Sequence, residues 1–182
     1  HVLCPGTYVD NIRSDLCNNM RKRATTRRVR SLTSYYTVEG VSILRPLKGL
    51  DPNMYESLET SFTQLYPKFE IIFAVADPDD PSLKIARELI EKYPDVDARI
   101  TIGEQIVGVN PKINNLMEAF GTAKYDILWV IDSNAQVVPD TLARSVDSLT
   151  HVRPSKPRVG LVHHVPYAIA SAHDSTIGTQ LE

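Results

Sequence analysis

From residue 41 onward, short apolar runs alternate with amphipathic segments, and this alternation constrains the fold more than any other feature of the 182-residue sequence. The run FEIIFAVA, residues 69–76, is apolar almost throughout, which is typical of a strand covered on both faces. Between such runs, apolar residues recur at helical spacing. Strands and helices that alternate in this way predict an α/β fold, a mostly parallel sheet with flanking helices.

The expected elements follow from this pattern. We expect strands at residues 41–46, 69–76, 96–102, 126–131 and 158–165, and helices within residues 50–67, 81–94, 111–123 and 139–152. The first helix has Asp51 as its predicted N-cap, Pro52 at its first position and Pro67 at its end. The side chains predicted to face the core are Tyr55, Leu58, Phe62 and Leu65 in the first helix, Leu83, Ala86, Ile90 and Tyr93 in the second, Ile113, Leu116, Met117 and Phe120 in the third, and Leu142, Val146 and Leu149 in the fourth.

Composition excludes several classes of protein. With 42% hydrophobic and 23% charged residues, the chain has the balance of a globular domain, and a net charge of -2 gives no general attraction to nucleic acid or acidic lipid. Cys4 and Cys17 have no zinc-type spacing, and no apolar run reaches the length of a membrane span. Dinucleotide-binding, P-loop and nucleophile-elbow motifs are absent.

Residues 1–40 differ from the rest because they lack periodicity and contain the basic run RKRATTRRVR. We expect a basic, disordered N-terminal tail here, solvated rather than packed. Contact with an anionic membrane surface is an alternative, and nucleic-acid binding is disfavoured because no aromatic residues interleave the basic ones. The predicted domain therefore comprises residues 41–182.

Acidic residues follow two of the predicted strands. Asp77, Asp79 and Asp80 come after the second strand, and Asp132 comes after the fourth. Because parallel strands end at the same edge of a sheet, we expect these carboxylates to converge there. Converging carboxylates repel one another unless a cation joins them, and oxygen ligands suit Mg²⁺ or Mn²⁺ bridged to a substrate diphosphate.

Each carboxylate also has a structural interpretation. Asp80 precedes a helix and is equally consistent with an N-cap and with a ligand, whereas Asp77 and Asp79 have the character of turn residues. Asp132 ends an apolar strand and is followed by the oxygen-bearing Ser133, so we interpret it as functional.

Three other positions carry functional interpretations. Lys112 lies in the first turn of a predicted helix, where the dipole disfavours a cation unless an anion such as phosphate faces it; solvent exposure is the alternative. His163 and His164 end a predicted strand, and a packed or hydrogen-bonded histidine is favoured over an active-site one. Trp129 is predicted to lie in the core.

The segments SILRPLKGLDPN, DPDDPSLKIA, KYPDVDARI, GVNPKINNLM, KYDILWVIDSN and VGLVHHVPY, in this order, resemble the ceramide glucosyltransferase family, inverting glycosyltransferases of the GT-A fold in family 21, similar to family 2. The resemblance implies a UDP-glucose donor, a ceramide acceptor in a membrane of the Golgi or endoplasmic reticulum, and Mg²⁺ or Mn²⁺. It implies that Asp80 and Asp77 lie in the nucleotide pocket and that Lys112 contacts the diphosphate. It also implies that Asp132 and Ser133 lie near the metal and the diphosphate, with Asp132 as metal ligand and catalytic residue.

The sequence departs from this family in three respects. The family's third aspartate, which is its implied general base, its Gln/Arg-x-x-Arg-Trp motif and its membrane segments are not found in these 182 residues. We therefore expect a fragment that holds the donor half of an active site and has little turnover by itself. Two alternatives stay open: a family 2-like synthase of a polysaccharide or another glycolipid, and a non-catalytic module that binds UDP-sugars.

Overall fold

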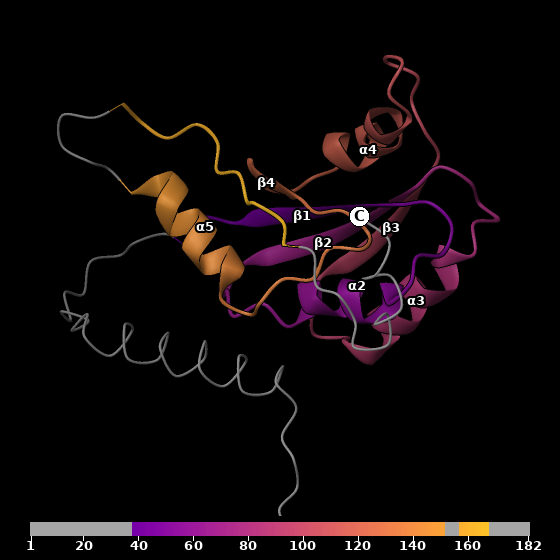
Figure 1. The fold of residues 1–182 in the computed structure, drawn as a ribbon, viewed down its shortest axis with the longest axis horizontal. Coiled ribbons are helices and arrows are strands. Elements are labelled where there is room, and N and C mark those ends of the chain that lie inside the picture. Colours follow the sequence, from indigo (N-terminus) through magenta and orange to yellow (C-terminus); the bar gives the residue numbers. More distant parts are fainter. Residues whose placement is uncertain (1–37, 152–156, 168–182) are drawn as a thin grey trace, which may run out of the picture. The chain divides into compact units, whose positions relative to one another are not determined.

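The computed structural model describes residues 38–151 and 157–167. In this part of the chain four parallel strands form one sheet in the order β3-β2-β1-β4 (Figure 1). The elements are β1 (Val41–Leu47), α2 (Met54–Phe62), β2 (Phe69–Val75), α3 (Ser82–Lys92), β3 (Ala98–Ile102), α4 (Pro111–Gly121), β4 (Ile127–Val130) and α5 (Thr141–Thr150). The predicted parallel sheet with flanking helices is confirmed. The basic run and both cysteines lie outside the described residues.

Helices cover both faces of the sheet, and each face has its own apolar core (Figure 1). The helix α4 packs on one face, and α2, α3 and α5 pack on the other. Since neighbouring residues of a strand point to opposite faces, β1 and β2 supply side chains to both cores. The larger core contains Ile43, Leu47, Leu58, Phe62, Ile71, Phe73, Leu83, Leu89 and Leu142, and the smaller one Leu44, Ile72, Ala74, Leu116 and Ala119.

Most of the predicted helix faces are confirmed, and the exceptions have identifiable causes. Leu65 was expected inside, but α2 already ends at Phe62 and Leu65 is 73% exposed. Its backbone amide instead donates to the Pro139 carbonyl at 2.7 Å, which anchors the loop before α5.

The helix α4 differs most from its prediction. Leu116 is buried as expected, but Ile113 and Phe120 are 46% and 56% exposed. Two polar residues, Asn114 and Asn115, are buried in their place. Asn114 Oδ1 accepts from the Val107 amide and the Asn115 side-chain NH₂ donates to the Ala74 carbonyl, so hydrogen bonds inside the protein partly compensate for burying these two polar residues.

The strand predicted at residues 158–165 is wrong. The described residues 157–167 have no strand, and Leu161 is 81% exposed. An apolar run becomes a strand only where a neighbour supplies ladder hydrogen bonds, and no ladder involves these residues in the described part of the chain. Likewise, among the described residues no helix is both long and apolar enough to cross a bilayer.

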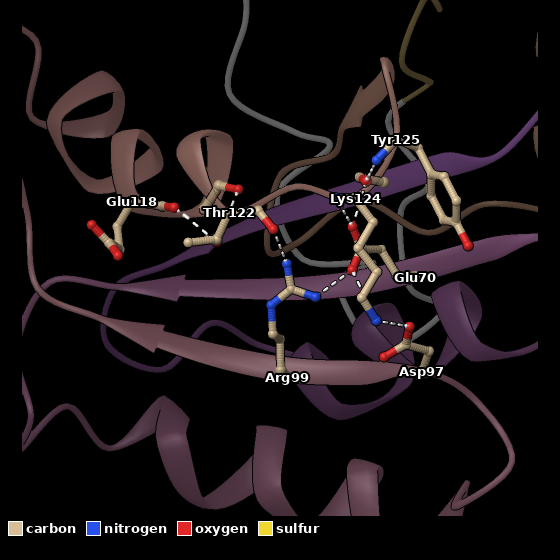
Figure 2. Close-up of polar contacts among 9 residues, drawn as sticks. Glu70, Asp97, Arg99, Glu118, Thr122, Lys124 and Tyr125 are labelled. Carbon is tan, nitrogen blue, oxygen red and sulfur yellow. Dashed lines mark hydrogen bonds and ion pairs between the residues drawn. The ribbon is translucent and has the colours of Figure 1, made fainter.

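A polar network at the amino-terminal ends of the strands joins α4 to the sheet (Figure 2). Glu70 on β2 is fully buried and accepts hydrogen bonds from the Ser42 hydroxyl at 2.5 Å and the Lys124 amide at 2.6 Å. It also pairs with Arg99 of β3, whose guanidinium donates to the Thr122 carbonyl just after α4. The network therefore fixes the carboxyl-terminal end of α4 against β2 and β3.

Candidate functional site at the carboxyl edge of the sheet

The loops that carry the predicted site residues lie at one edge of the sheet. Leu47 pairs with Val75, and Val75 with Ile102, so β1, β2 and β3 end level with one another. The strand β4 ends at Val130, opposite Leu44, and runs in the same direction. The loops after β2 and β4, with their aspartates, therefore meet the loop after β1 at a common rim, as expected for parallel strands.

Asp132 and Lys112 lie together at this rim. The Lys112 ammonium pairs with Asp132 Oδ1, and both side chains are accessible, 45% and 59% exposed. Lys112 thus comes from the first turn of α4 and Asp132 from the loop after β4. The structure brings together a cation and a carboxylate that lie twenty positions apart in the sequence.

The Asp80 carboxylate is occupied by hydrogen bonds from two loops. Its Oδ1 accepts from the Ser82 amide at 2.8 Å and from the Ser82 hydroxyl at 2.6 Å, and its Oδ2 accepts from the Gly49 amide at 2.8 Å. Burial alone would raise its pKa, but these hydrogen bonds and the charge of Lys48 hold the pKa below its usual value. Asp80 therefore acts as a cap at the start of α3 and ties that helix to the loop after β1. Its role in a nucleotide pocket stays a prediction.

Asp77 forms a local turn. Its Oδ1 accepts from the Asp79 amide at 2.9 Å, and its carbonyl accepts from the Asp80 amide at 3.1 Å. This is the turn interpretation of the DPDD sequence. The Asp77 side chain is exposed at the same rim, and its contact with a nucleotide stays a prediction.

Ser133 contacts Asp51, for which the sequence predicted a different role. The Ser133 hydroxyl donates to Asp51 Oδ2. Asp51 was predicted to cap the first helix, but α2 begins at Met54, and Asn53 occupies the cap position with a positive φ of 56°. The loop after β1 is thus attached to the loop after β4 through Asp51, as it is attached to the start of α3 through Asp80.

Arg45, inside β1, is a site-supporting residue that the sequence interpretation missed. It is fully buried, and its guanidinium donates to the Ser133 carbonyl at 3.3 Å and the Ala135 carbonyl at 3.2 Å. Burial lowers the pKa of the guanidinium to about 10, against the opposing attraction of Asp132. An arginine inside an otherwise apolar strand was the signal that could have identified it.

The amino-terminal turn of α4 is closed by its own asparagine. Asn110 Oδ1 accepts from the Lys112 amide at 3.0 Å, and the Asn110 carbonyl accepts from the Ile113 and Asn114 amides. Amides at a helix amino terminus commonly bind a phosphate, but here the chain itself uses them. Lys112 therefore contributes its side chain, and not its backbone, to the rim.

Two further asparagines organise the rim from α4. Asn114 Oδ1 accepts from the amides of Val107 and Gly108, which holds the loop before α4. Asn115 is 7% exposed and donates to the Leu47 carbonyl at 3.2 Å and the Ala74 carbonyl at 3.0 Å. It joins α4 to the ends of β1 and β2, a role that spacing alone did not indicate.

The histidine and tryptophan predictions are partly tested. His164 Nε2 lies 2.9 Å from the Ser145 hydroxyl of α5, and its ring centroid lies 6.1 Å from that of Trp129. The hydrogen-bonded interpretation is therefore confirmed for His164, although both histidines are exposed. Trp129 is partly buried and packs against the larger core.

The rim suits a metal ion shared with a substrate, and not one enclosed by protein ligands alone. Within the described residues, no group of three or more His, Cys, Asp or Glu side chains could enclose a metal ion. The carboxylate of Asp80 already accepts three hydrogen bonds from N–H and O–H donors. The accessible Asp132 suits a cation that completes its coordination with phosphate oxygens and water, which is how proteins usually bind Mg²⁺.

Comparisons with known proteins agree with this arrangement. Residues 12–182 match the model of Glycosyl transferase family 21. The chain is 48% identical over 148 residues to a ceramide glucosyltransferase of Komagataella phaffii, covering 73% of this chain and 29% of that protein. It is 46% identical to a ceramide glucosyltransferase of Candida albicans, covering 78% of this chain and 30% of the relative. The chain thus spans about three tenths of the length of these relatives.

A solved structure supports the fold. The mannosyltransferase PcManGT from Pyrobaculum calidifontis, in complex with GDP-Man and Mn²⁺, superposes with a TM-score of 0.55 at 23% identity, over 74% of this chain and 39% of that one. The predicted GT-A fold is therefore confirmed. The parallel sheet and the accessible Asp132 and Lys112 at its carboxyl edge are consistent with the family match over residues 12–182. The chain therefore belongs to glycosyl transferase family 21.

Proposed function

We propose that this chain forms the donor-binding part of a ceramide glucosyltransferase. The whole protein transfers glucose from UDP-glucose to the primary hydroxyl of ceramide, with inversion at the anomeric carbon. Support comes from the family match and from relatives named ceramide glucosyltransferase at 46% and 48% identity. As a protein with a lipid acceptor, it acts at a membrane of the Golgi or endoplasmic reticulum, on the cytosolic face.

The observation that carries the proposal is the exposed ion pair of Lys112 with Asp132. An exposed pair of this kind stabilises a protein by only about 0–1 kcal/mol, so separating it is cheap. A diphosphate with its cation offers each partner a stronger contact: Lys112 turns to a phosphate, and Asp132 to the cation. The pair thus keeps the two side chains at the right place before the donor binds.

The remaining residues have matching roles. Asp132 is the metal ligand, and Ser133 beside it lies against the diphosphate. Asp80 and Asp77 line the nucleotide pocket. Because its oxygens already accept three hydrogen bonds, Asp80 shapes this pocket through the loop after β1. A bound Mg²⁺ or Mn²⁺ supplies positive charge that offsets the charge growing on the departing UDP.

The acceptor half requires groups beyond this site. A general base has to reach the ceramide hydroxyl, and we assign that role to none of the described residues. We predict that the 182-residue chain alone gives little or no glucosylceramide when incubated with UDP-glucose, ceramide and Mn²⁺. Robust product formation by this chain would contradict that prediction.

The test of the proposed function uses the whole protein in detergent or lipid. We expect glucosylceramide formation from UDP-glucose that requires a divalent cation and falls by about a hundredfold or more in Asp132→Asn, since a charge-stabilising contact is lost. Lys112→Ala should lose activity as well, whereas the control Lys84→Ala, exposed on α3, should not. Full activity of Asp132→Asn would refute the assignment.

Two other functions are distinguished by related measurements. A family 2-like synthase of a polysaccharide or another glycolipid would use the same donor site but would transfer the sugar to another acceptor and not to ceramide. A non-catalytic module would bind UDP with metal without transferring sugar to any acceptor. No UDP binding at all would exclude the donor site itself.

A further inference from the structure

We infer that Arg45 is a positioning residue for the donor site, because its buried guanidinium holds the turn that presents Asp132. This inference rests on the proposed function and adds a residue to it that neither the family resemblance nor the motif pattern assigned. Arg45 acts through the backbone of the turn and does not contact the substrate.

The turn in question comprises residues 132–135. The Ala135 amide donates to the Asp132 carbonyl at 3.1 Å, which closes a four-residue turn directly after β4. The Arg45 guanidinium donates to the Ser133 and Ala135 carbonyls, so it contacts two of the three residues that follow Asp132. One rigid fork therefore fixes both the middle and the end of the turn.

The guanidinium lies on the strand face that packs against the larger, mostly apolar core. Arg45 lies between Ile43 and Leu47 on the strand face that packs against the larger core, and it is fully buried. Its Nε has no hydrogen-bond partner in the described part of the protein, and its two hydrogen bonds of 3.2 and 3.3 Å are long. Such incomplete pairing does not offset the desolvation of a charge well, so an apolar side chain of similar length would fit here without a large loss of stability.

An apolar replacement would remove the interactions that position the Asp132 carboxylate. The positive charge attracts the Asp132 carboxylate, and the fork sets the direction in which that carboxylate leaves the sheet. The later part of the loop has separate anchors: Thr60 accepts from the Val137 amide, and Gln64 donates to the Val138 carbonyl. At the start of the loop, the Ser133 hydroxyl also donates to Asp51 and the Ser57 hydroxyl to the Asn134 carbonyl. Loss of Arg45 should therefore release the Ser133 and Ala135 carbonyls and leave the remainder of the loop in place.

The experiment measures UDP binding to the full chain by calorimetry, with and without Mn²⁺, together with the melting temperature of each variant. We expect Arg45→Met to weaken Mn²⁺-dependent UDP binding by about tenfold or more while the protein stays folded, as for other residues that orient a metal ligand. Arg45→Lys keeps the charge but loses the fork, so it should recover part of this loss and weaken binding by about threefold. Glu70→Gln is the control, because it alters a buried polar network on the other face of the sheet.

The outcomes separate this inference from the proposed function. If the wild-type chain shows no Mn²⁺-dependent UDP binding, the proposed function fails, and the role of Arg45 fails with it. If the wild type binds, Asp132→Ala does not, and folded Arg45→Met binds as tightly as wild type, only the role of Arg45 is refuted. If Arg45→Met does not fold, Arg45→Lys decides: weaker binding at an unchanged melting temperature supports the inference, and unchanged binding overturns it.

Discussion

Replacing Glu70 with alanine removes the carboxylate at the centre of the network that joins α4 to the sheet (Figure 2). The Glu70 side chain is fully buried, so the Ser42 hydroxyl beside it is also shielded from water. The Ser42 hydroxyl and the Lys124 amide each lose an acceptor. The Arg99 side chain is 29% exposed and can be hydrated in part.

These contacts set the expected loss of stability. An orphaned buried donor costs about 1–3 kcal/mol, which applies to the buried Ser42 hydroxyl and in part to the partly buried Lys124 amide. Breaking a buried ion pair by removal of one partner costs about 3–5 kcal/mol in other proteins. Because Arg99 is partly hydrated, we expect the lower part of this range, about 3 kcal/mol. For a chain of this size, that corresponds to a melting temperature lower by about 6–12 °C.

Urea unfolding followed by circular dichroism at pH 7 measures this loss. The control is Lys84→Ala, which removes an exposed side chain of α3 and should change the free energy of unfolding by about 0.5 kcal/mol or less. A loss below about 1 kcal/mol in Glu70→Ala would refute the argument, since it would mean that Ser42 and Lys124 find other partners at no cost.

The pH dependence gives a second check on Glu70. Burial alone would raise its pKa, but hydrogen bonds from Ser42, the Lys124 amide and Arg99 hold the pKa below its ordinary value of 4.5. A carboxylate with a lowered folded pKa contributes stability above the unfolded pKa, and this contribution is lost as the pH falls through the folded pKa. The difference in stability between wild type and Glu70→Gln should therefore shrink from pH 7 toward pH 3, and a constant difference would contradict this explanation.

Two further predictions concern the loops and the sheet. Asp80→Ala should lower the free energy of unfolding by about 2 kcal/mol, because it leaves donors from Ser82 and Gly49 unpaired, and Asp80→Asn should lower it by less. Chemical denaturation measures both variants. Equal stability of the wild type and both variants would show that Asp80 does not act as a cap. Gly40→Ala should cost about 1–3 kcal/mol, because a Cβ at this position would lie 2.2 Å from the Tyr125 ring; a melting temperature equal to that of wild type would show that the ring moves aside freely.

The sequence predicted the sheet because its strands are apolar runs and its helices have clear periodicity. It misjudged α4 because the face that packs on the sheet is rotated away from the apolar stripe. Leu116 is buried but Ile113 and Phe120 are exposed, and spacing could not show that Asn115 would turn inward to bond the ends of β1 and β2. It also misjudged residues 158–165, since a strand requires a ladder partner and composition does not reveal one.

The site was predictable as a set of residues but not as a set of contacts. The carboxyl-edge rule places Asp80 and Asp132 on one rim, and the structure agrees. The partners of each carboxylate could not be predicted, since they depend on how the loops fold over one another. Asp51 contacts Ser133 and does not cap α2, and the buried Arg45 holds the turn after Asp132.

The most direct test of the donor site is calorimetric titration of UDP into the full chain with Mn²⁺, with Mg²⁺ and without metal, for the wild type and Asp132→Asn. We predict that a divalent cation strengthens UDP binding to the wild type and that this strengthening is lost in Asp132→Asn. Equal metal-dependent binding by both proteins would contradict the claim that Asp132 holds a cation against a diphosphate at the carboxyl edge of the sheet.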